Sequence, residues 1–588
     1  MFNNFDIVEM PLTVKRNRTM VENFLAKSDL RLDDVDYYAA VVDRESYSML
    51  AGGGFEGDII KCIAVDDSLR GTGISQQLIS HLMSQMNAQG HNSVKVFTKP
   101  GNIDIFESLG FKTLGESSKA ILLENGLDGL STYVNYLSSL KREGNNGMIV
   151  MNANPFTLGH KYLVEQAAAQ VDNLYVIVVA EDKSLFTSNE RLAMVTAGCA
   201  HLKNVTVCRG SSYIISAATF PSYFIKQASD AAMAQIELDL DVTARHIAPA
   251  LGATVRFVGS EPSDELTRAY NQAMHNQLPQ RGIKVIELQR LEKKGNPVSA
   301  SNVSKQLTGG NLRSAMSLVP TTTLPYLVSW LAVNALQQEL DLTPKPGLVD
   351  THDNGAHTDM DYGTMQRSIN ALRPYFTQLA VMSCDGTLPA ARELQQLGID
   401  AEKTMLYATS GVNTHRGALF SMGLAVVAAC NVLANGCNSD VLDQWSKIVA
   451  NIASQMQGCN DSHGSNVKKQ HNVAGALDLA RTGYKDASKW TSFYLHNSND
   501  EHIKHKTLLF IMCSLDDTNV IHRAGYDVAQ QVKQEAAHLL ENFSIEGLEQ
   551  MNQSFIERNI SPGGAADMLS LTLFLSTLTN KTIINSFF

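Results

Sequence analysis

Hydrophobic and polar residues follow three successive patterns along the chain, and the first covers Asp36 to Lys112. Short apolar runs at Tyr37–Val42, Ile59–Val65 and Ser93–Phe97 predict strands, since each has the length and β-branched content of a strand. Ile74–Ala88 repeats its apolar positions with a helical period and predicts an amphipathic helix. This order predicts a small α/β domain.

The second pattern follows a polar, turn-rich segment at Lys141 to Gly147, where we expect a domain boundary. Met148–Met151, Leu174–Ala180 and Thr254–Val258 are largely apolar, as strands of a parallel sheet are, and helical segments lie between them. The pattern predicts a doubly wound α/β domain.

Beyond Pro320 the chain shows helical periods rich in Ala, Leu and Met and few β-branched runs, which predicts an all-α domain to Phe588. A chain of 588 residues exceeds one hydrophobic core. We therefore expect a multi-domain protein with domains at 1–140, 141–319 and 320–588.

The composition is that of a globular protein, with 44% hydrophobic and 18% charged residues. The formal charge of -11 disfavours binding to nucleic acid or to an anionic membrane, so we expect neither as a partner. The 8 cysteines contain no Cys-x-x-Cys pair, which indicates neither a zinc site nor a disulfide framework. Thiols of this kind are typical of a reducing compartment.

The sequence also bears on location in the cell. Met1 to Lys15 lacks the basic start and apolar run of a signal peptide. The longest apolar stretch, Gly417 to Ala434, is rich in Gly and Ala and contains Ser421 and Asn431, so it suits a buried helix better than a membrane span. We expect a cytoplasmic protein.

A first candidate site lies at Gly71 and Gly73, in a turn between a predicted strand and a predicted helix. Such a turn can bring backbone amides toward a pyrophosphate, although two glycines in a turn, taken alone, are more often structural. Together with Asn102–Phe106 and Leu109–Phe111, the segment resembles the GNAT acetyltransferase family, whose fold holds coenzyme A at this turn. The family's Gln or Arg falls on Ser68, so binding of a CoA-like group is expected more than acetyl transfer.

A second candidate site lies where a strand runs into a helix. Asn154 stands in the turn, and Thr157, Gly159 and His160 begin the helix. Helix-end amides, the Thr157 hydroxyl and the His160 imidazole could converge on a triphosphate, and Gly159 would let it approach. The structural alternative is a helix-capping Thr and a packed His.

A matching segment lies at Val298–Lys305, with Ser299, Ser301 and Lys305. The two segments together resemble the HxGH nucleotidyltransferase superfamily, which implies hydroxyls and a cation at the β- and γ-phosphates. Thr157 stands where many members carry the first His, and the family's Arg falls on Ser304. Lys305 could supply the charge as a point cation. The resemblance assigns catalytic roles to Thr157, His160 and Lys305.

The order of these segments over residues 1 to 320 resembles the citrate lyase ligase family. This resemblance implies that acetate attacks ATP to form acetyl adenylate, and that a carrier thiol then takes the acetyl group. It implies ATP and Mg²⁺ as cofactors and the citrate lyase acyl carrier protein subunit as the partner. The GNAT-like domain would hold the CoA-like arm of that carrier.

A third candidate site is a set of four polar clusters in the helical domain, at Thr343–Asp361, Gly411–Gly417, Asp516–Arg523 and Ser561–Asp567. Carboxylates, amides and basic groups at loop and helix ends suit a Mg²⁺-triphosphate, because hard oxygen ligands bind the metal and cations bind phosphate. The alternative is a set of solvated loops with Asx turns.

These clusters resemble the triphosphoribosyl-dephospho-CoA synthase family, which joins the ribose of ATP to the substrate dephospho-CoA and releases adenine. The resemblance implies phosphate contacts by Lys345 and Arg416, and catalytic roles for Asp350, Asp359 and Asp517. It implies Mg²⁺ ligation by Asp350, Asp359 and Asp516. The implied nucleotide-binding residues are Asn354, His357, Asn413, His415, Asn519 and Arg523.

One segment departs from this family, whose Gly-Ala-Arg-Gly-Glu-Ala stretch appears here as Gly475–Ala480. Two alternatives therefore stay open beside a bifunctional enzyme. The helical domain could be an inactive module that binds CoA-like ligands, or the chain could act mainly as a GNAT N-acetyltransferase. Release of adenine, or consumption of acetyl-CoA without ATP, would discriminate between them.

Overall fold

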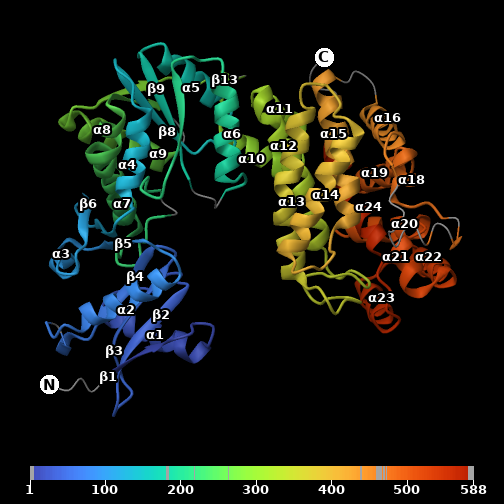
Figure 1. The fold of residues 1–588 in the computed structure, drawn as a ribbon. Helices are drawn as coiled ribbons and strands as arrows, with labels where there is room; N and C mark the ends of the chain where they lie inside the picture. Colours follow the sequence, from blue (N-terminus) through green and yellow to red (C-terminus); the bar gives the residue numbers. More distant parts are fainter. Residues whose placement is uncertain are drawn as a thin grey trace. The chain divides into compact units, whose positions relative to one another are not determined.

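The computed structural model describes residues 5–69, 71–180, 184–216, 219–261, 264–293, 295–436, 440–457, 467, 470–471 and 473–579. The chain divides into two compact units, Met1–Ala300 and Ser301–Phe588 (Figure 1). The first contains both α/β parts expected from the sequence. Each unit is described by itself.

The N-terminal part of the first unit is built on a seven-stranded sheet with the order β1-β2-β3-β4-β5-β7-β6. Its strands are β1 (Phe5–Glu9), β2 (Tyr37–Asp43), β3 (Met49–Glu56), β4 (Ile59–Val65), β5 (Ser93–Thr98), β6 (Lys112–Glu116) and β7 (Ile121–Gly126). All neighbours are antiparallel except β4 and β5. That parallel pair is joined only at Ile59↔Lys95 and Ile60↔Val96. The ladder between β4 and β5 therefore stops well before the carboxyl end of β4.

Helices cover both faces of this sheet. The face carrying Tyr38, Ala40 and Cys62 packs against α1 (Lys15–Lys27). The face carrying Ala39 and Val41 packs against α2 (Ile74–Ala88) and the short α3 (Ile103–Glu107). The alternation of β2 residues between the two cores is the period of two expected for a strand.

The second part of this unit contains a five-stranded parallel sheet with the order β10-β9-β8-β11-β12. The strands are β8 (Asn146–Met151), β9 (Asn173–Val178), β10 (Val205–Arg209), β11 (Ala253–Gly259) and β12 (Lys284–Leu288). Successive strands run outward from β8 to β10, and the chain then returns to β11 on the other side of β8. In open sheets of this kind, ligands bind beyond the carboxyl ends of the strands where the order reverses.

The helices of this part are α4 (Leu130–Leu140), α5 (Leu158–Ala168), α6 (Ser188–Cys199), α7 (Ala228–Val242), α8 (Ala248–Leu251) and α9 (Glu265–Gln277). A π-helical turn, Thr243–Ile247, joins α7 to α8. Helices α5 and α6 pack against the sheet strands, and α4 packs against α8. A two-stranded hairpin of β13 (Glu292–Lys293) and β14 (Asn296–Pro297) follows β12.

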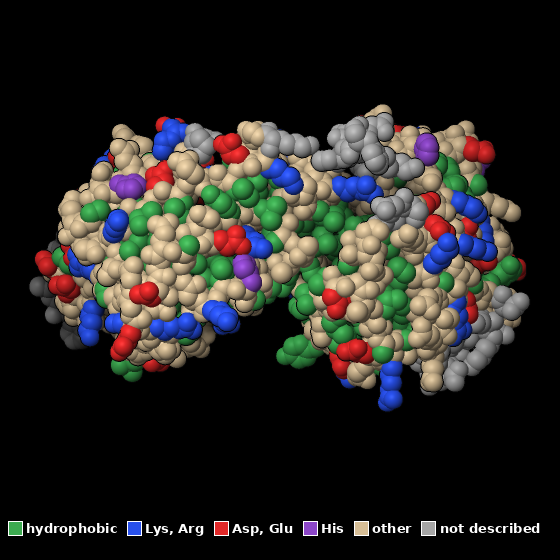
Figure 2. Space-filling view, turned by 90° about the horizontal axis from the view of Figure 1, so that it is seen from above, with side chains coloured by type: hydrophobic (Ala, Val, Ile, Leu, Met, Phe, Trp, Pro, Cys, Tyr) green, Lys and Arg blue, Asp and Glu red, His purple; other side chains and the backbone are tan. Residues whose placement is uncertain are grey.

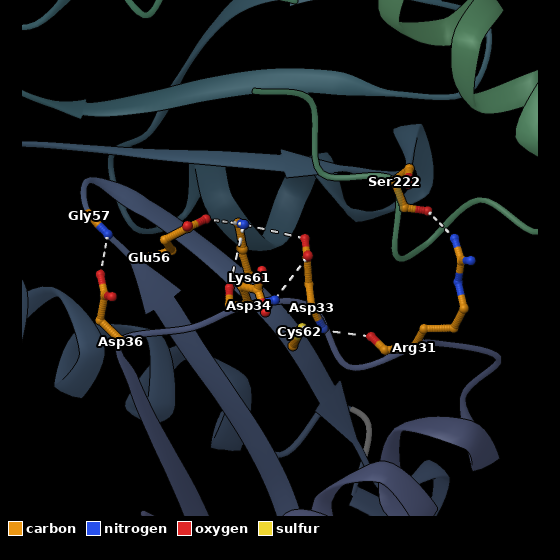
Figure 3. A network of polar contacts seen from close by, with 9 residues as sticks. All are labelled: Arg31, Asp33, Asp34, Asp36, Glu56, Gly57, Lys61, Cys62 and Ser222. Carbon is orange, nitrogen blue, oxygen red and sulfur yellow. Dashed lines mark hydrogen bonds and ion pairs between the residues drawn. The ribbon is translucent and has the colours of Figure 1, made fainter. Parts of the chain in front are cut away.

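The two parts of the first unit share one hydrophobic core. Tyr213, Phe220 and Tyr223 lie in the same buried cluster as Tyr38 and Cys62 of the first sheet. Polar contacts accompany this packing: Arg31 donates to the carbonyl of Ser222 at 3.1 Å (Figure 3), and Lys95 donates to Ser212 Oγ at 2.7 Å. The segment after β10 therefore covers one face of the first sheet.

The second unit is helical throughout its described residues. It contains α10 (Ala300–Thr308), which begins at the unit boundary, α11 (Leu312–Met316), α12 (Leu324–Leu340), α13 (Tyr362–Ser383), α14 (Ala391–Ala408), α15 (Arg416–Asn435), α16 (Val441–Ser454), α18 (Ala476–Arg481), α19 (Ala487–His496), α20 (Ile503–Ser514), α21 (Thr518–Ala524), α22 (Tyr526–Glu541), α23 (Ile545–Glu557) and α24 (Gly563–Thr579). Helices α12, α15 and α24 pack on one another. They bury most of their residues and form the centre of the bundle.

One helix of the described residues, α15, is long and apolar enough to cross a membrane. Of its most apolar 18-residue window, 78% is buried inside the protein. A core helix of a bundle has the same length and composition, which agrees with the buried helix expected at Gly417 to Ala434.

Charged side chains of both signs are interspersed over the face shown in Figure 2. The fold class expected from the sequence is confirmed: an α/β part with a mixed sheet, a doubly wound parallel part and an all-α part follow one another. The predicted strands and helix at 37–42, 59–65, 74–88 and 93–97 coincide with β2, β4, α2 and β5.

The shared core of the first unit generates a prediction. Phe97 is 3% exposed and meets Phe220 edge to face, with ring centroids 5.6 Å apart. Replacing Phe97 with Ala should lower the free energy of unfolding by about 3 to 5 kcal/mol, because a buried ring and its contacts are lost. Hydrogen exchange should show both parts of the unit losing protection together.

The matched control is Phe106→Ala, which removes a ring that is 4% exposed on the opposite face, next to Phe111. This change should increase exchange chiefly around α2 and α3. Equal effects of the two variants on the second sheet would contradict the shared core.

Candidate functional site

The glycine turn of the first sheet ends at the start of α2. Gly71 and Gly73 have φ angles of 79° and 83°, which only glycine adopts readily. A Cβ at either position would meet nothing within 4 Å, and α2 has no side-chain cap. The amides of its first turn are therefore open to a ligand. The neighbouring Arg70 lies outside the described residues.

Thr157 and His160 form a capping box at the start of α5. The backbone N–H of His160 donates to Thr157 Oγ1 at 3.2 Å, and the backbone N–H of Thr157 donates to His160 Nδ1 at 3.1 Å. This is the structural role considered for these two residues, and it buries the Thr157 side chain.

The same contacts decide which nitrogen of His160 carries the proton. A backbone N–H can only donate, so Nδ1 is an acceptor and the hydrogen of the neutral ring lies on Nε2. Burial, with the positive charge of Arg290 as a second cause, lowers the pKa of His160 to about 4. The ring is therefore neutral at pH 7, and no hydrogen bond to Nε2 is seen among the described residues. His160 presents an N–H donor while it caps the helix.

A buried arginine fixes the loop before this helix. The guanidinium of Arg191, in α6, is fully buried and donates to the carbonyl and the Oδ1 of Asn152 at 2.9 and 2.6 Å. It also donates to the carbonyl of Val179 at 2.8 Å. Asn154 Oδ1 accepts from the amide of Phe186 at 3.1 Å. The carboxyl ends of β8 and β9 are thus tied to the start of α6.

A second arginine lies at the carboxyl edge of the parallel sheet. Arg290 follows β12 and pairs with Glu261, which follows β11. The Arg290 side chain is 30% exposed and lies within electrostatic reach of His160. A cation, an N–H donor and a helix start therefore gather where the strand order reverses.

The second motif of this part begins beside the first. A Cβ on Gly159 would lie 2.5 Å from the carbonyl oxygen of Val298, so the glycine admits the backbone of the second motif. The expected close approach at Gly159 is thus made by the protein chain. Ser299 directly follows Val298, while Ser301 and Lys305 are exposed in α10.

The four polar clusters of the helical unit meet at several contacts. His357 Nε2 lies 2.8 Å from Ser561 Oγ, and Arg523 donates to the carbonyl of Ala356 at 3.2 Å. A Cβ on Gly417 would lie 1.9 Å from Asp567. Each of the four clusters therefore contacts at least one of the other three clusters.

The Lys345 loop is held by internal polar contacts. Lys345 is 1% exposed, and its Nζ lies 2.5 Å from Glu339 Oε1. Asp350 is 2% exposed and accepts from the backbone N–H groups of Lys345, His352 and Asp353. Both side chains hold the loop in its conformation through contacts within the protein, and these contacts need no ligand.

Asp517 caps α21 from inside the unit. It accepts from the N–H groups of Asn519 and Val520, and its other oxygen accepts from the N–H of Ala565 at 2.9 Å. Burial raises the pKa of Asp517, and these backbone donors act in the opposite direction. His415 is 4% exposed, and burial lowers its pKa to about 4.

The remaining candidates are less enclosed. Asn354, Asn413, Arg416, Asp359 and Asn519 are exposed. Arg416 pairs with Glu402 at 3.0 Å, and the half-exposed Asp516 pairs with Lys533 at 2.5 Å. Within the described part of the chain, no group of three His, Cys, Asp or Glu side chains could hold a metal ion. Asp350, Asp359 and Asp516 therefore do not form a ready three-ligand site.

Four residues of these sites were not selected from the sequence: Arg191, Arg290, Glu339 and Asp567. Arg191 holds the loop before α5, Arg290 acts on His160, and Asp567 lies against Gly417, all between distant segments. Glu339 pairs with Lys345, six positions away. Asp567 lies in one of the polar clusters, and the Gly-Gly pair before it could have marked it as a site residue. Nothing in the sequence around the other three residues marks them in this way, because their neighbours are ordinary helix and strand residues.

In the segment that departs from its family pattern, Asp478 and Arg481 form hydrogen bonds within the protein. Asp478 accepts from the amide of Gly475 at 3.1 Å. Arg481 donates to the carbonyls of Met456 at 2.9 Å and Ala453 at 3.4 Å. Part of the preceding stretch, residues 458–466, lies outside the described residues.

Comparison with known protein families agrees with this three-part organisation. Residues 30–123 match the acetyltransferase (GNAT) domain family. Residues 146–327 match the citrate lyase ligase C-terminal domain, and residues 326–586 match the ATP:dephospho-CoA triphosphoribosyl transferase family.

Individual relatives cover the two halves separately. The chain is 39% identical over 320 residues to a citrate (pro-3S)-lyase ligase of Klebsiella pneumoniae, a match of 53% of this chain and 93% of the relative. It is 38% identical over 262 residues to a probable 2-(5''-triphosphoribosyl)-3'-dephosphocoenzyme-A synthase of Pseudomonas syringae pv. tomato, a match of 42% of this chain and 90% of the relative.

Two solved structures align with smaller parts. A putative acyl-CoA N-acyltransferase of Klebsiella pneumoniae is 13% identical, with a TM-score of 0.18, and covers 21% of this chain and 97% of its own. A putative triphosphoribosyl-dephospho-CoA synthase of Archaeoglobus fulgidus is 15% identical, with a TM-score of 0.27, and covers 37% of this chain and 99% of its own.

This chain therefore contains nearly the full length of a ligase relative followed by nearly the full length of a synthase relative. The chain belongs to the citrate lyase ligase family over its N-terminal half and to the triphosphoribosyl-dephospho-CoA synthase family over its C-terminal half.

Proposed function

We propose that the chain is a bifunctional enzyme that serves the acyl carrier protein subunit of citrate lyase. The first unit joins acetate to the thiol of the carrier's prosthetic group through acetyl adenylate. The second makes 2'-(5''-triphosphoribosyl)-3'-dephospho-CoA from ATP and dephospho-CoA and releases adenine. The near-complete coverage of both kinds of relative carries this proposal.

The adenylation step needs positioning and charge neutralisation at the phosphates of ATP. We assign the Nε2–H of His160 to a phosphate oxygen, because the capping contacts aim the other nitrogen inward. Arg290 supplies a nearby cation. Asn154, Ser299, Ser301 and Lys305 remain assigned to the nucleotide. Thr157 holds the imidazole in place, and Gly159 admits the backbone at Val298.

In the helical unit we retain the assignment of Arg416, His357, Asn354, Asn413, His415, Asn519 and Arg523 to the nucleotide. Lys345 and Asp350 act through the loop that they order. Mg²⁺ in proteins uses one or two carboxylates together with substrate phosphates, and Asp516 and Asp359 have exposed oxygens suited to this. Bound there, the ion would neutralise charge on the triphosphate.

We assign the GNAT-like part to docking of the carrier's CoA-like arm. The open amides at Gly71 and Gly73 and the separated carboxyl end of β4 support binding there. Transfer to an external amine is less supported, because Tyr223 and its neighbours cover the sheet face that carries Cys62. Cys62 is fully buried, and Figure 3 shows it among the contacts of Arg31, Asp33 and Lys61.

A cytoplasmic location belongs to the same proposal, since all six described cysteines are free thiols. The alternative of an inactive helical module rests on the altered Gly475–Ala480 segment. Buried polar atoms of His415 and Tyr484 without a partner among the described residues favour activity, because such atoms are nearly always satisfied by a ligand or a partner. Adenine release by the purified chain decides between them.

The capping box generates the first functional prediction. His160→Gln keeps an acceptor for the Thr157 amide, since Gln is usual at this position of a capping box. It removes the imidazole N–H. We expect acetate-dependent exchange between ATP and pyrophosphate to fall by roughly 10²-fold or more, with an unchanged melting temperature. Adenine release from ATP and dephospho-CoA should remain intact.

The control for the cap is His160→Ala, which should lose a similar amount of exchange and also destabilise α5, by about 1 kcal/mol. Loss of both activities in a folded His160→Gln variant would refute two independent sites.

A second prediction concerns the carrier arm. Gly71→Glu places a side chain and a negative charge at the open amides of α2. Acetyl adenylate should still form, but transfer of the acetyl group to the carrier thiol should slow. Gly90→Glu is the matched control, since Gly90 has a φ of 91° and open space but lies after the other end of α2. Equal transfer rates for the two variants would argue against docking at this turn.

A third prediction tests the metal. Asp516→Asn should raise the Mg²⁺ concentration for half-maximal adenine release by roughly tenfold or more, because a ligand charge is lost. Asp500→Asn is the control, since Asp500 also pairs with a lysine at 2.5 Å but lies outside the four clusters. An unchanged Mg²⁺ requirement in Asp516→Asn would move the metal to other ligands.

A further inference from the structure

Asp567, in α24, stands where the clusters of the helical unit meet. Its side chain accepts from the backbone N–H of Ala418, in the first turn of α15. No cation of the described residues lies within ion-pair distance of it, and it retains partial exposure to solvent. It therefore differs from the paired or fully capped carboxylates around it.

The chain makes room for this carboxyl group. A Cβ on Gly417 would lie 1.9 Å from Asp567 Oδ2, so any other residue there would displace the side chain. Gly564 similarly leaves space for Asp517, whose carboxyl carbon would lie 3.0 Å from an added Cβ. Two glycines of the polar clusters thus admit two acids to the same interior.

The acids that act on Asp567 come from two other elements. Asp517 of the α21 cap and Glu339 of α12 both act on it with negative charge. Glu339 is compensated by Lys345 and Asp517 by three backbone N–H groups, whereas Asp567 accepts only from the N–H of Ala418. Burial, followed by these two carboxylates, raises the pKa of Asp567 well above its ordinary value of 3.8. This shift favours the protonated carboxylic acid, which can donate a hydrogen.

Two buried polar atoms near this acid have no partner among the described residues. They are the hydroxyl of Tyr484 and Nε2 of His415, and each side chain belongs to a residue that is 4% exposed. Tyr484 lies within electrostatic reach of Asp567, and His415 precedes Gly417 by two residues. Buried polar groups are nearly always satisfied, so these atoms point to a polar ligand.

We propose that Asp567 is the general acid that protonates adenine as it leaves the ribose of ATP, with Tyr484 and His415 contacting the base. The inference rests on the proposed transferase function of this unit. A purine edge carries several ring nitrogens that accept hydrogen bonds and one amino donor, which suits an acid, a hydroxyl and an imidazole.

The step balances without a further reactant. The bond between C1' of the ribose and N9 of adenine breaks, and its electron pair leaves with the base. A bond forms between C1' and the 2'-hydroxyl oxygen of dephospho-CoA. Asp567 gives its proton to a ring nitrogen of adenine, and the hydroxyl proton passes through water to restore the acid.

The test is adenine release by the full chain with Mg²⁺, ATP and dephospho-CoA. Asp567→Asn should lower kcat on the order of 10²-fold or more, with little change in KM for dephospho-CoA. The deficit should shrink with an ATP analogue whose base is a better leaving group, such as 2-fluoro-ATP. Added formate should restore part of the rate of Asp567→Ala. A merely structural aspartate would show neither response.

Stability provides a second readout that does not depend on catalysis. As pH rises above 3.8, the carboxyl group ionises in the unfolded chain before it ionises in the folded one, so wild type loses stability. Asn has no such loss. Asp567→Asn should therefore melt at a higher temperature than wild type at pH 8, and the difference should vanish near pH 3.

The outcomes separate the two hypotheses. A more stable variant that has lost adenine release, with the leaving-group response, supports the general acid. A variant as active as wild type, or one with the same deficit on every analogue and no rescue by formate, overturns it. Wild-type protein that releases no adenine would instead refute the transferase function.

Discussion

The first turn of a helix leaves backbone N–H groups without partners, and each candidate site of this protein is built on such a turn. At α2 the amides follow Gly73 and have no side-chain cap. At α5 and α21 a capping residue, Thr157 or Asp517, accepts from them. The chemistry available at each site depends on what accepts from these N–H groups. N–H groups without a protein partner can bind an anion, whereas N–H groups bound by a capping residue hold the capping side chain in place.

Burial then decides the charge state of the groups held at these turns. His160 and His415 are enclosed, and burial lowers the pKa of each to about 4, so both are neutral donors and acceptors at pH 7. Asp517 and Asp567 are enclosed acids, and burial raises the pKa of each. Lys345 is buried as an ion pair with Glu339, at 2.5 Å. The interior of each unit thus offers neutral hydrogen-bonding groups as well as cations.

Much of the fold could be predicted from the sequence, because apolar periodicity is local. The strands at 37–42 and 59–65 and the helix at 74–88 follow from runs of a few residues, and the structure has them within one residue at each end. The glycine turn and the start of α5 were also readable, since each combines a strand end, a turn and a helix start.

The contacts that define the sites could not be predicted in the same way, because they join distant segments. Arg191 reaches Asn152 across 39 positions, and nothing near Arg191 marks it as more than a helix residue. Gly159 seemed to admit a phosphate, but its neighbour is the carbonyl of Val298. Lys345 and Asp350 looked like ligand contacts, yet their polar atoms are used within the protein. Residue type predicted which polar side chains lie in the candidate sites. Only the packing shows which of their polar atoms are already bonded within the protein.

The division of the chain into two compact units puts the candidate residues at the start of α5 in one unit and the four polar clusters in the other. The first unit joins its GNAT-like and adenylating parts through one core, with Tyr223 buried against the sheet that carries the glycine turn. Coupling is therefore expected inside this unit, between its two parts. The helical unit has its own core of α12, α15 and α24, which bring Glu339, Gly417 and Asp567 together. Its chemistry depends on helix ends within that bundle, so each activity can respond to mutation independently of the other.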